Sequence, residues 1–229
     1  MKLLIALAVS TLTVGAQAAF CDSGHNWNNN CAEAAKKAGK PVGITPGVME
    51  VAGISRVQDG ANTIHPAFAK TSRPCPPFCI QPFNPFEPAQ VETVTENDVI
   101  AAAKAVADGD TSVILIDSRT PVWTTAKKGG KIPHAVNIPF NKLNDKALAK
   151  DPMAVVEILT DQFGVADMDG VLNFENAKTL YLYCNGLWCG QSPAAIRALL
   201  KIGYPEAKLK YYRGGMNSWQ SLGLSTTGK

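Results

Sequence analysis

From residue 91 onward, short apolar runs alternate with helix-like segments, and this order restricts the fold more than any other feature of the sequence. The runs at 111–117, 135–139, 179–184 and 209–212 are rich in β-branched, aromatic and leucine side chains, which is typical of strands. Helical patterns separate them at 96–106, 152–163 and 194–202. Strands that alternate with helices predict an α/β domain with a mainly parallel sheet.

Local signals set the bounds of these helices. Thr95 followed by Asp98 forms a capping pair, which predicts a helix through Val106. Asp151 before Pro152 predicts a helix to Phe163 with proline at its first position. The dipeptide at 192–193 is expected to cap the helix over 194–202, which the glycine at 203 ends.

The first eighteen residues have the features of a targeting segment. Lys2 supplies a positive start, 3–14 is an apolar run, and Ala16-Gln17-Ala18 is a small-residue cleavage site. The apolar run is too short to span a bilayer comfortably. We therefore expect residues 1–18 to be a cleaved signal peptide, and the mature chain to begin near Ala19 in the periplasm or outside the cell, where disulfides are allowed.

The net charge of the chain is mild. It carries 22 Lys and Arg against 19 Asp and Glu, a formal charge of +3, and it has no basic run. This balance does not favour a nucleic-acid partner or a membrane surface. After removal of the first eighteen residues, the remaining length fits one domain with an extension. We expect a monomer or a weak oligomer.

Residues 19–91 differ in composition from the rest of the chain. Nine of the fifteen prolines precede residue 90, and proline disfavours long helices and central strands. We expect an irregular extension over 19–91, with a short helix around 32–38 and two strands near 48–57, followed by the main domain over 92–229. Its cysteines, Cys21, Cys31, Cys75 and Cys79, allow three disulfide pairings. Alternatively, Cys75 and Cys79 form a second redox pair near the main site.

Two further cysteines occupy the loop in "YLYCNGLWCGQSPAAIRALL". Cys184 ends a predicted strand, and the loop leads into the next helix. Ligands bind at this edge of open α/β sheets, where unpaired backbone amides and a helix dipole favour negative charge. Gly186 and Gly190 let the loop curl around one point. A thiol held there is expected to have a lowered pKa and to act as a nucleophile.

Three segments with distinctive motifs follow one another in the domain. The first, "LIDSRTPVWTTAKKGGKIPHAVNIPF", joins Asp117-x-Arg119 to Gly130-x-Ile132-Pro133-x-Ala135 and Pro139. The second is the cysteine loop with its strand and helix. The third, "YYRGGMNSWQSLG", contains Gly214, Gly215 and Trp219. Together they resemble a rhodanese (sulfurtransferase) domain.

The resemblance implies a mainly parallel five-stranded sheet flanked by helices, and a sulfur-transfer activity without a cofactor. Cys184 would take sulfane sulfur as a persulfide from thiosulfate, a polysulfide or a protein persulfide, and pass it to a thiol acceptor or redox protein. The loop would bind the donor, with its amides directed at negative charge. The substrate-binding residues expected are Asn185, Gly186, Leu187, Trp188, Gly190, Gln191 and Arg119. The alternative is a redox or binding module on the same scaffold, without turnover.

The loop departs from the family's usual pattern. It is longer, contains no cation, and adds Trp188 and Cys189. A neutral loop is expected to suit a polysulfide or protein persulfide better than thiosulfate. Arg119 or Arg197 could supply the missing charge, although Arg119 could instead brace the sheet edge, with Asp117 in a structural role.

The second cysteine has several possible roles. Cys189 could resolve a Cys184 persulfide or form a reversible disulfide with Cys184. It could equally be a small loop residue, or half of a structural disulfide. The loop has no histidine and its spacing is not C-x2-C, so no metal site is expected.

Overall fold

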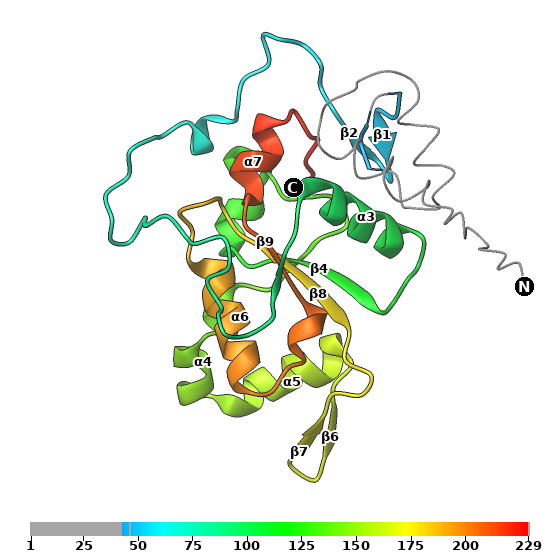
Figure 1. Cartoon of the computed structure of the whole chain (residues 1–229), viewed down its shortest axis with the longest axis vertical. Coiled ribbons are helices and arrows are strands. Elements are labelled where there is room, and N and C mark those ends of the chain that lie inside the picture. The colour runs from blue at the N-terminus through cyan, green and yellow to red at the C-terminus, as the bar shows by residue number, and fades with distance from the viewer. Residues whose placement is uncertain (1–42, 46, 229) are drawn as a thin grey trace, which may run out of the picture.

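The computed structural model describes residues 43–45 and 47–228 (Figure 1). The expected signal peptide, the expected helix around 32–38, and Cys21 and Cys31 lie outside the described residues. None of the described helices is long and apolar enough to cross a membrane.

A parallel five-stranded sheet forms the centre of the molecule, as predicted. Its strand order is β3-β9-β8-β4-β5, and every neighbouring pair is parallel. The strands are β3 (Glu92–Thr93), β4 (Val113–Asp117), β5 (Val136–Asn137), β8 (Thr179–Tyr183) and β9 (Leu209–Tyr212). Because Asp117 pairs with Tyr183, β4 and β8 end level with each other, and the residues that follow them meet at one edge.

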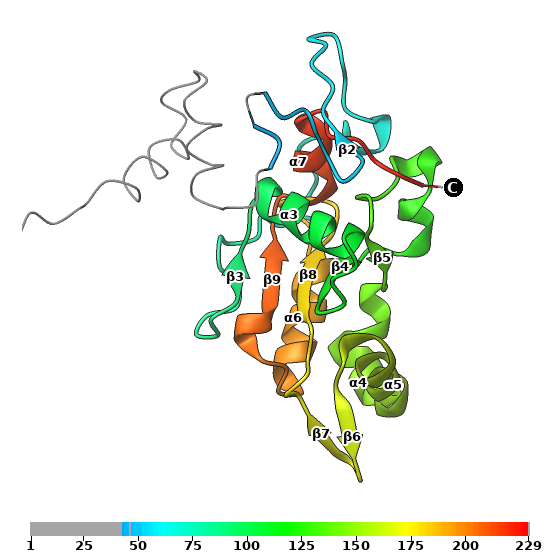
Figure 2. The same ribbon diagram turned by 90° about the vertical axis from the view of Figure 1, so that its right-hand side faces the viewer.

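Helices cover both faces of the sheet (Figure 2). One face packs against α3 (Glu96–Ala107) and α7 (Gly215–Ser221), with Trp219 at the centre of that core. The other packs against α4 (Asp145–Lys150), α5 (Pro152–Phe163) and α6 (Gln191–Lys201), around residues such as Leu182 and Phe163. Side chains alternate across a strand, so Leu180 and Leu182 of β8 face α6 while Tyr183 faces α3.

The capping signals place two of the helices correctly. Thr95 and Asp98 form a capping box at the start of α3, and the Asp151 side chain accepts a hydrogen bond from the Ala154 amide at the start of α5. The third prediction is wrong, because α6 starts at Gln191 and its N-cap is Gly190. Ser192 lies inside the first turn, and its hydroxyl bonds a sulfur atom instead of a helix amide.

The extension contains the two predicted strands. β1 (Glu50–Val51) and β2 (Ile54–Ser55) pair antiparallel. It continues through the short 3-10 helix η1 (Pro66–Phe68) and irregular chain, which the Cys75–Cys79 disulfide closes into a small loop. Other 3-10 turns are η2 (Pro121–Thr124), η3 (Ala126–Lys128), η4 (Phe140–Lys142) and η5 (Glu206–Lys208).

A projecting hairpin was not predicted. It consists of β6 (Ala166–Met168) and β7 (Val171–Asn173), and extends away from the sheet in Figure 1. Asp169 and Gly170 form its turn with φ values of 53° and 86°. An Asp-Gly pair with positive φ is a strong hairpin signal, which could have identified it from the sequence.

The extension packs onto the domain. Ile54 and Phe68 are buried in the α3–α7 core, and Phe86 is buried in the α5–α6 core. The C-terminal tail also binds the extension, because the Ser225 amide donates to the Ser55 carbonyl at 2.8 Å. The extension is therefore placed firmly against the edge of the sheet where the cysteine loop lies.

Candidate active site at the Cys184–Cys189 loop

The cysteine loop connects β8 to α6 at the carboxyl edge of the sheet, as predicted. Cys184 directly follows the last residue of β8, and α6 begins at Gln191. Both cysteines are free thiols, so the structure does not contain the disulfide that was one alternative for them. Both are also buried, with exposed fractions of 2% for Cys184 and 6% for Cys189.

Cys184 lies under the first turn of α6. Its Sγ atom accepts a hydrogen bond from the Ser192 hydroxyl at 3.1 Å, and its thiol donates to the Cys189 carbonyl at 3.4 Å. Burial raises the pKa of Cys184 well above its ordinary value, because the charged form loses its hydration. The predicted lowering of this pKa is therefore wrong for the resting dithiol.

The hydrogen-bond donors of the loop converge on Cys189 rather than on Cys184. The pKa of Cys189 is lowered to about 7, chiefly by hydrogen bonding with the Cys184 side chain. The backbone amides of Asn185 and Gln191 and the Asn185 side chain add to this effect, with Asn185 Nδ2 at 3.8 Å from Cys189 Sγ. Above a pH of about 7, Cys189 is therefore mainly a thiolate while Cys184 stays protonated.

A glycine in the third motif allows the loop to lie against the start of α7. Gly215 has a φ of 56°, and a Cβ atom there would come within 2.5 Å of the Cys184 carbonyl oxygen. The same turn binds the loop through backbone hydrogen bonds from Met216 to Cys184 and from Asn217 to Asn185. The close contact and the left-handed backbone both require glycine at this position.

Arg119 braces the edge of the sheet next to the loop. Its guanidinium forms a double hydrogen bond with Asp117, with Nε–Oδ1 at 2.8 Å and Nη2–Oδ2 at 2.5 Å, and both side chains are 0% exposed. Arg119 also donates to the Gly130 carbonyl, and the Tyr183 hydroxyl donates to Asp117. These contacts are those expected of a brace at the sheet edge, and the expected contact of Arg119 with a sulfur donor stays a prediction.

Part of the extension covers the loop, and it includes Cys75 and Cys79, which one alternative from the sequence had placed near the main site. We call residues 73–83 the cover segment. The Gln81 amide donates to the Leu187 carbonyl at 2.8 Å, and Arg213 donates to the Gln81 carbonyl at 2.8 Å. The Arg73 guanidinium carbon lies 5.1 Å from the centre of the Phe78 ring and 5.4 Å from that of Trp188. These contacts hold the cover segment against Leu187 and Trp188, the loop residues that directly precede Cys189.

The other loop residues that were expected to bind substrate differ in their exposure and in their contacts with the cover segment. Leu187 is partly exposed, and Trp188 is half-buried under Arg73. Gly190 is exposed close to the Gln81 side chain, and Gly186 is buried against Trp188 and Asn217.

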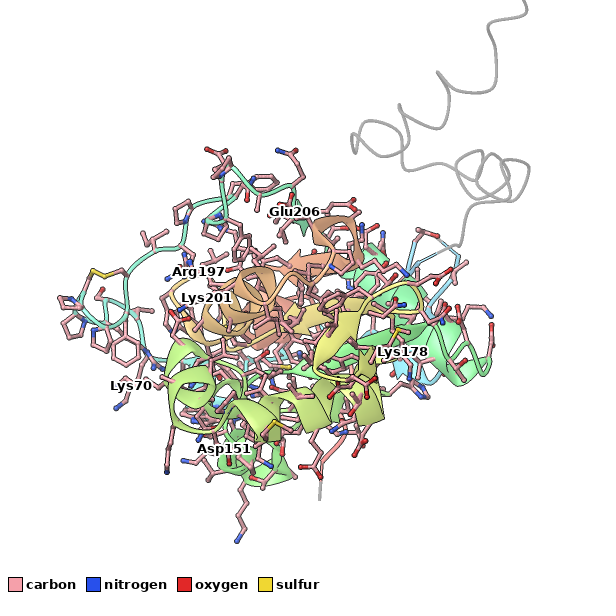
Figure 3. All side chains as sticks on the ribbon, turned by 90° about the horizontal axis from the view of Figure 1, so that it is seen from below. Lys70, Asp151, Lys178, Arg197, Lys201 and Glu206 are labelled. Carbon is pink, nitrogen blue, oxygen red and sulfur yellow. A yellow bond between two sulfur atoms is a disulfide. The ribbon has the colours of Figure 1, made fainter. Side chains whose placement is uncertain are left out.

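Of the two features proposed near the site, the Arg197 cation lies elsewhere, whereas the Cys75–Cys79 pair lies in the cover segment next to the loop. Arg197 points away from the loop, since it donates to the Pro85 carbonyl at 3.1 Å and lies over the Phe86 ring. Figure 3 shows Arg197 and Lys201 along α6. Cys75 and Cys79 form a disulfide inside the cover segment, so this pair is one of the disulfides that the sequence allowed. Among the described residues, no three His, Cys, Asp or Glu side chains gather as metal ligands.

Tyr211 is a site neighbour that sequence reasoning missed. It lies on β9 opposite Leu182, and its buried hydroxyl has no hydrogen-bond partner among the described residues. Burial raises its pKa, and the charges of Cys184 and Cys189 raise it further. Tyr211 therefore stays a neutral phenol close to the two thiols. Only the strand register, which needs the structure, brings it there.

Comparison with known proteins identifies one family model that matches the chain, the rhodanese-like domain, over residues 100–222. No curated protein matches the chain. A crystal structure of a Bacillus halodurans protein is 17% identical, with a TM-score of 0.35, and the match covers 60% of this chain and 78% of that one. A full-length Lactobacillus plantarum protein is 15% identical, with a TM-score of 0.35 and coverage of 60% and 88%.

Proposed function

The chain belongs to the rhodanese-like domain family, and from this membership we propose that it is a sulfurtransferase in which Cys184 carries sulfane sulfur as a persulfide. The observation that carries the proposal is the position of Cys184. It directly follows β8, accepts a hydrogen bond from Ser192, and lies in hydrogen-bonding contact with a second thiol of lowered pKa. This arrangement supports nucleophilic attack by sulfur.

In the first step, Cys189 would act as the base and Cys184 as the nucleophile. The Cys189 thiolate accepts the Cys184 proton, and the freed Cys184 sulfur attacks the sulfane sulfur of the donor. The bond between that sulfur and the donor breaks, and the donor leaves with the electron pair, as sulfite if the donor is thiosulfate. The Ser192 hydroxyl, 3.1 Å from Cys184 Sγ, stabilises negative charge on this sulfur.

The persulfide then has two possible outcomes. In sulfur transfer, an acceptor thiolate attacks the outer sulfur and releases Cys184 as a thiolate. In the second candidate function, Cys189 attacks the Cys184 sulfur and expels hydrosulfide, which leaves a Cys184–Cys189 disulfide. A thiol reductant or redox protein must then reduce that disulfide. The contact between the free thiols and the lowered pKa of Cys189 favour keeping this redox function as the alternative.

We further propose an exported location, periplasmic or secreted, with a small sulfur donor and a thiol acceptor or redox protein as partners. The signal-like first eighteen residues and the Cys75–Cys79 disulfide support this location. N-terminal sequencing of protein recovered from the cell envelope or medium tests it. A chain that still begins at Met1 would contradict export by signal cleavage.

Intact-mass measurement tests the sulfur-transfer proposal. We expect the reduced protein to gain the mass of one sulfur on incubation with thiosulfate or a polysulfide, and to lose it on treatment with cyanide. Cys184→Ser should gain none at any incubation time. Cys189→Ser should still load, more slowly, and should hold its persulfide longer because the resolving thiol is missing.

The Cys189→Ser variant serves as the matched control, since it removes a thiol from the same loop. Sulfur loading of Cys184→Ser to the level of the unmodified protein would contradict Cys184 as the carrier. If neither the unmodified protein nor Cys189→Ser loads with any donor, both outcomes of the persulfide are excluded, and a binding module without sulfur uptake remains as the function.

A further inference from the structure

A cationic groove lies between the extension and the 121–128 segment. Its volume is about 430 Å³. The side chains that define it are His65, Lys70, Arg73, Trp123, Lys127 and Lys128. In Figure 3, Lys70 projects from the extension on the side of the molecule that carries the disulfide. The groove therefore presents four permanent positive charges to one space.

None of these charges is neutralised within the described part of the chain. The ion pairs found there involve Lys104, Arg119, Lys201 and Lys210, and none involves a groove residue. No acidic residue occurs in 60–86 or in 118–144, the two segments that form the groove. Like charges held close together repel, and an anion bound between them relieves that repulsion.

One of the cations has an unsatisfied donor. Arg73 Nε is buried and has no hydrogen-bond partner among the described residues. A buried donor on a charged group without a partner is costly, and such atoms often mark a ligand position. The Lys128 ammonium lies 5.8 Å from the centre of the Trp123 ring, which helps to hold it in place.

The groove borders the cysteine loop through Arg73. The guanidinium that lines the groove also lies over the Trp188 ring, and Trp188 directly precedes Cys189. The loop itself contains no cation, while Arg119 and Arg197 are directed at other partners. Arg213, beside the loop, is bound to the Gln81 carbonyl, so Arg73 is the cation that connects the groove to the loop.

We propose that this groove binds a small doubly charged sulfur oxyanion, thiosulfate as the donor or sulfite as the product, and so supplies from outside the charge that the loop lacks. Four cations in a concave space suit a compact dianion. The role of the groove as a donor subsite rests on the proposed sulfur transfer, whereas the binding of the anion does not.

Titration calorimetry on the Cys184→Ser protein tests binding alone, with thiosulfate and sulfite as separate probes. We expect the added change Lys127→Gln/Lys128→Gln to weaken binding about tenfold, because each exposed charge interaction contributes roughly 0.2–1 kcal/mol. Both lysines are exposed, so the variant should fold normally. The matched control is Lys146→Gln/Lys150→Gln, two exposed lysines on α4, which should leave the affinity unchanged.

Steady-state kinetics of the otherwise unmodified protein tests the role in turnover. The groove variant should raise the KM for thiosulfate about tenfold at unchanged kcat, and should leave an uncharged organic trisulfide donor unaffected. Suppose that the anions bind, that the groove variant lowers their affinity, and that the protein never acquires sulfur. This result would support the groove as an anion site and contradict the proposed sulfur transfer. If neither anion binds, or if both pairs of lysine variants behave alike, the groove proposal is overturned.

Discussion

At the scale of single residues, the position of hydrogen-bond donors decides which of two neighbouring thiols carries charge. Cys184 and Cys189 are both buried in one loop, yet their pKa values move in opposite directions. Cys189 gathers the amides of Asn185 and Gln191 together with the Cys184 thiol. Cys184 has the Ser192 hydroxyl and amide, which do not offset its burial.

A pH titration of thiolate ultraviolet absorbance should detect this division. We expect one thiolate to form with a midpoint of about 7. Because the folded-state pKa is lowered, the charge is present above that midpoint and is lost as the pH falls through it. In Cys184→Ala, which has no side-chain donor, the midpoint should move up toward the ordinary cysteine value, since the largest cause of the lowering is removed. A midpoint of about 7 that disappears in Cys184→Ala but persists in Cys189→Ala would reverse the assignment.

The Asp117–Arg119 pair permits a prediction about stability. Asp117→Asn should lower the free energy of unfolding by roughly 3–5 kcal/mol, because it leaves a buried guanidinium without its counter-charge. Urea unfolding measures the effect. The control is Asp108→Asn, which breaks the exposed pair with Lys104 and should cost at most about 0.5 kcal/mol. Similar losses in both variants would mean that Arg119 is not a structural brace.

The sequence allowed part of this site to be predicted. Cys184 could be placed at the sheet edge because strand period and helix caps are local signals. The charge on Cys189 could not, since it depends on the directions of a few N–H groups within one loop. The role of Arg119 was similarly open, because Asp117 lies two residues away but the burial of the pair depends on the packed sheet.

At the scale of elements, capping residues predicted where helices start better than the sequence predicted which segments pack around them. Capping at Thr95 and Asp151 set the starts of α3 and α5 correctly. Ser192 was misassigned because its hydroxyl had a competing partner, the Cys184 sulfur, which lies eight positions away in sequence. The sequence left the position of the cover segment open between two alternatives, since proline-rich chain has no periodicity that indicates where it packs.

The cover segment should control access to the thiols. Arg213→Met removes the charged donor that holds the Gln81 and Pro82 carbonyls. Such bonds contribute roughly 1.5–3 kcal/mol, so the open population should rise at least about tenfold. We expect alkylation of Cys189 by a neutral maleimide to accelerate by that factor, measured by peptide mass spectrometry above the thiol's pKa.

A matched arginine provides the control for this experiment. Arg56 donates to the Leu222 carbonyl at 2.8 Å, away from the loop. Arg56→Met should therefore leave the alkylation rate of Cys189 unchanged. If Arg213→Met alkylates no faster than Arg56→Met, the thiols are reached by a route that does not require the cover segment to open.

At the scale of the whole molecule, the extension and the domain share their cores. The extension contributes Phe86 to the core under α5 and α6, where its ring meets that of Tyr211 edge-on at 5.3 Å. Ile54 and Phe68 join the opposite core. Composition suggested a boundary near residue 91, yet buried contacts cross it on both faces of the sheet. We therefore expect one cooperative unfolding transition for both parts.

Two phenylalanines three residues apart test this coupling. Phe86 is 5% exposed and Phe83 is 72% exposed, so they differ in burial but share chain context and chemistry. Phe86→Ala should lower the free energy of unfolding by about 3–5 kcal/mol, through lost burial and the cavity left in the core. Phe83→Ala should change it by less than about 0.5 kcal/mol. Urea unfolding followed by tryptophan fluorescence and by circular dichroism measures both, and the two probes should give the same midpoint. If Phe86→Ala instead leaves the main transition in place and only introduces a separate early one, the extension unfolds by itself and its hold on the cysteine loop is local.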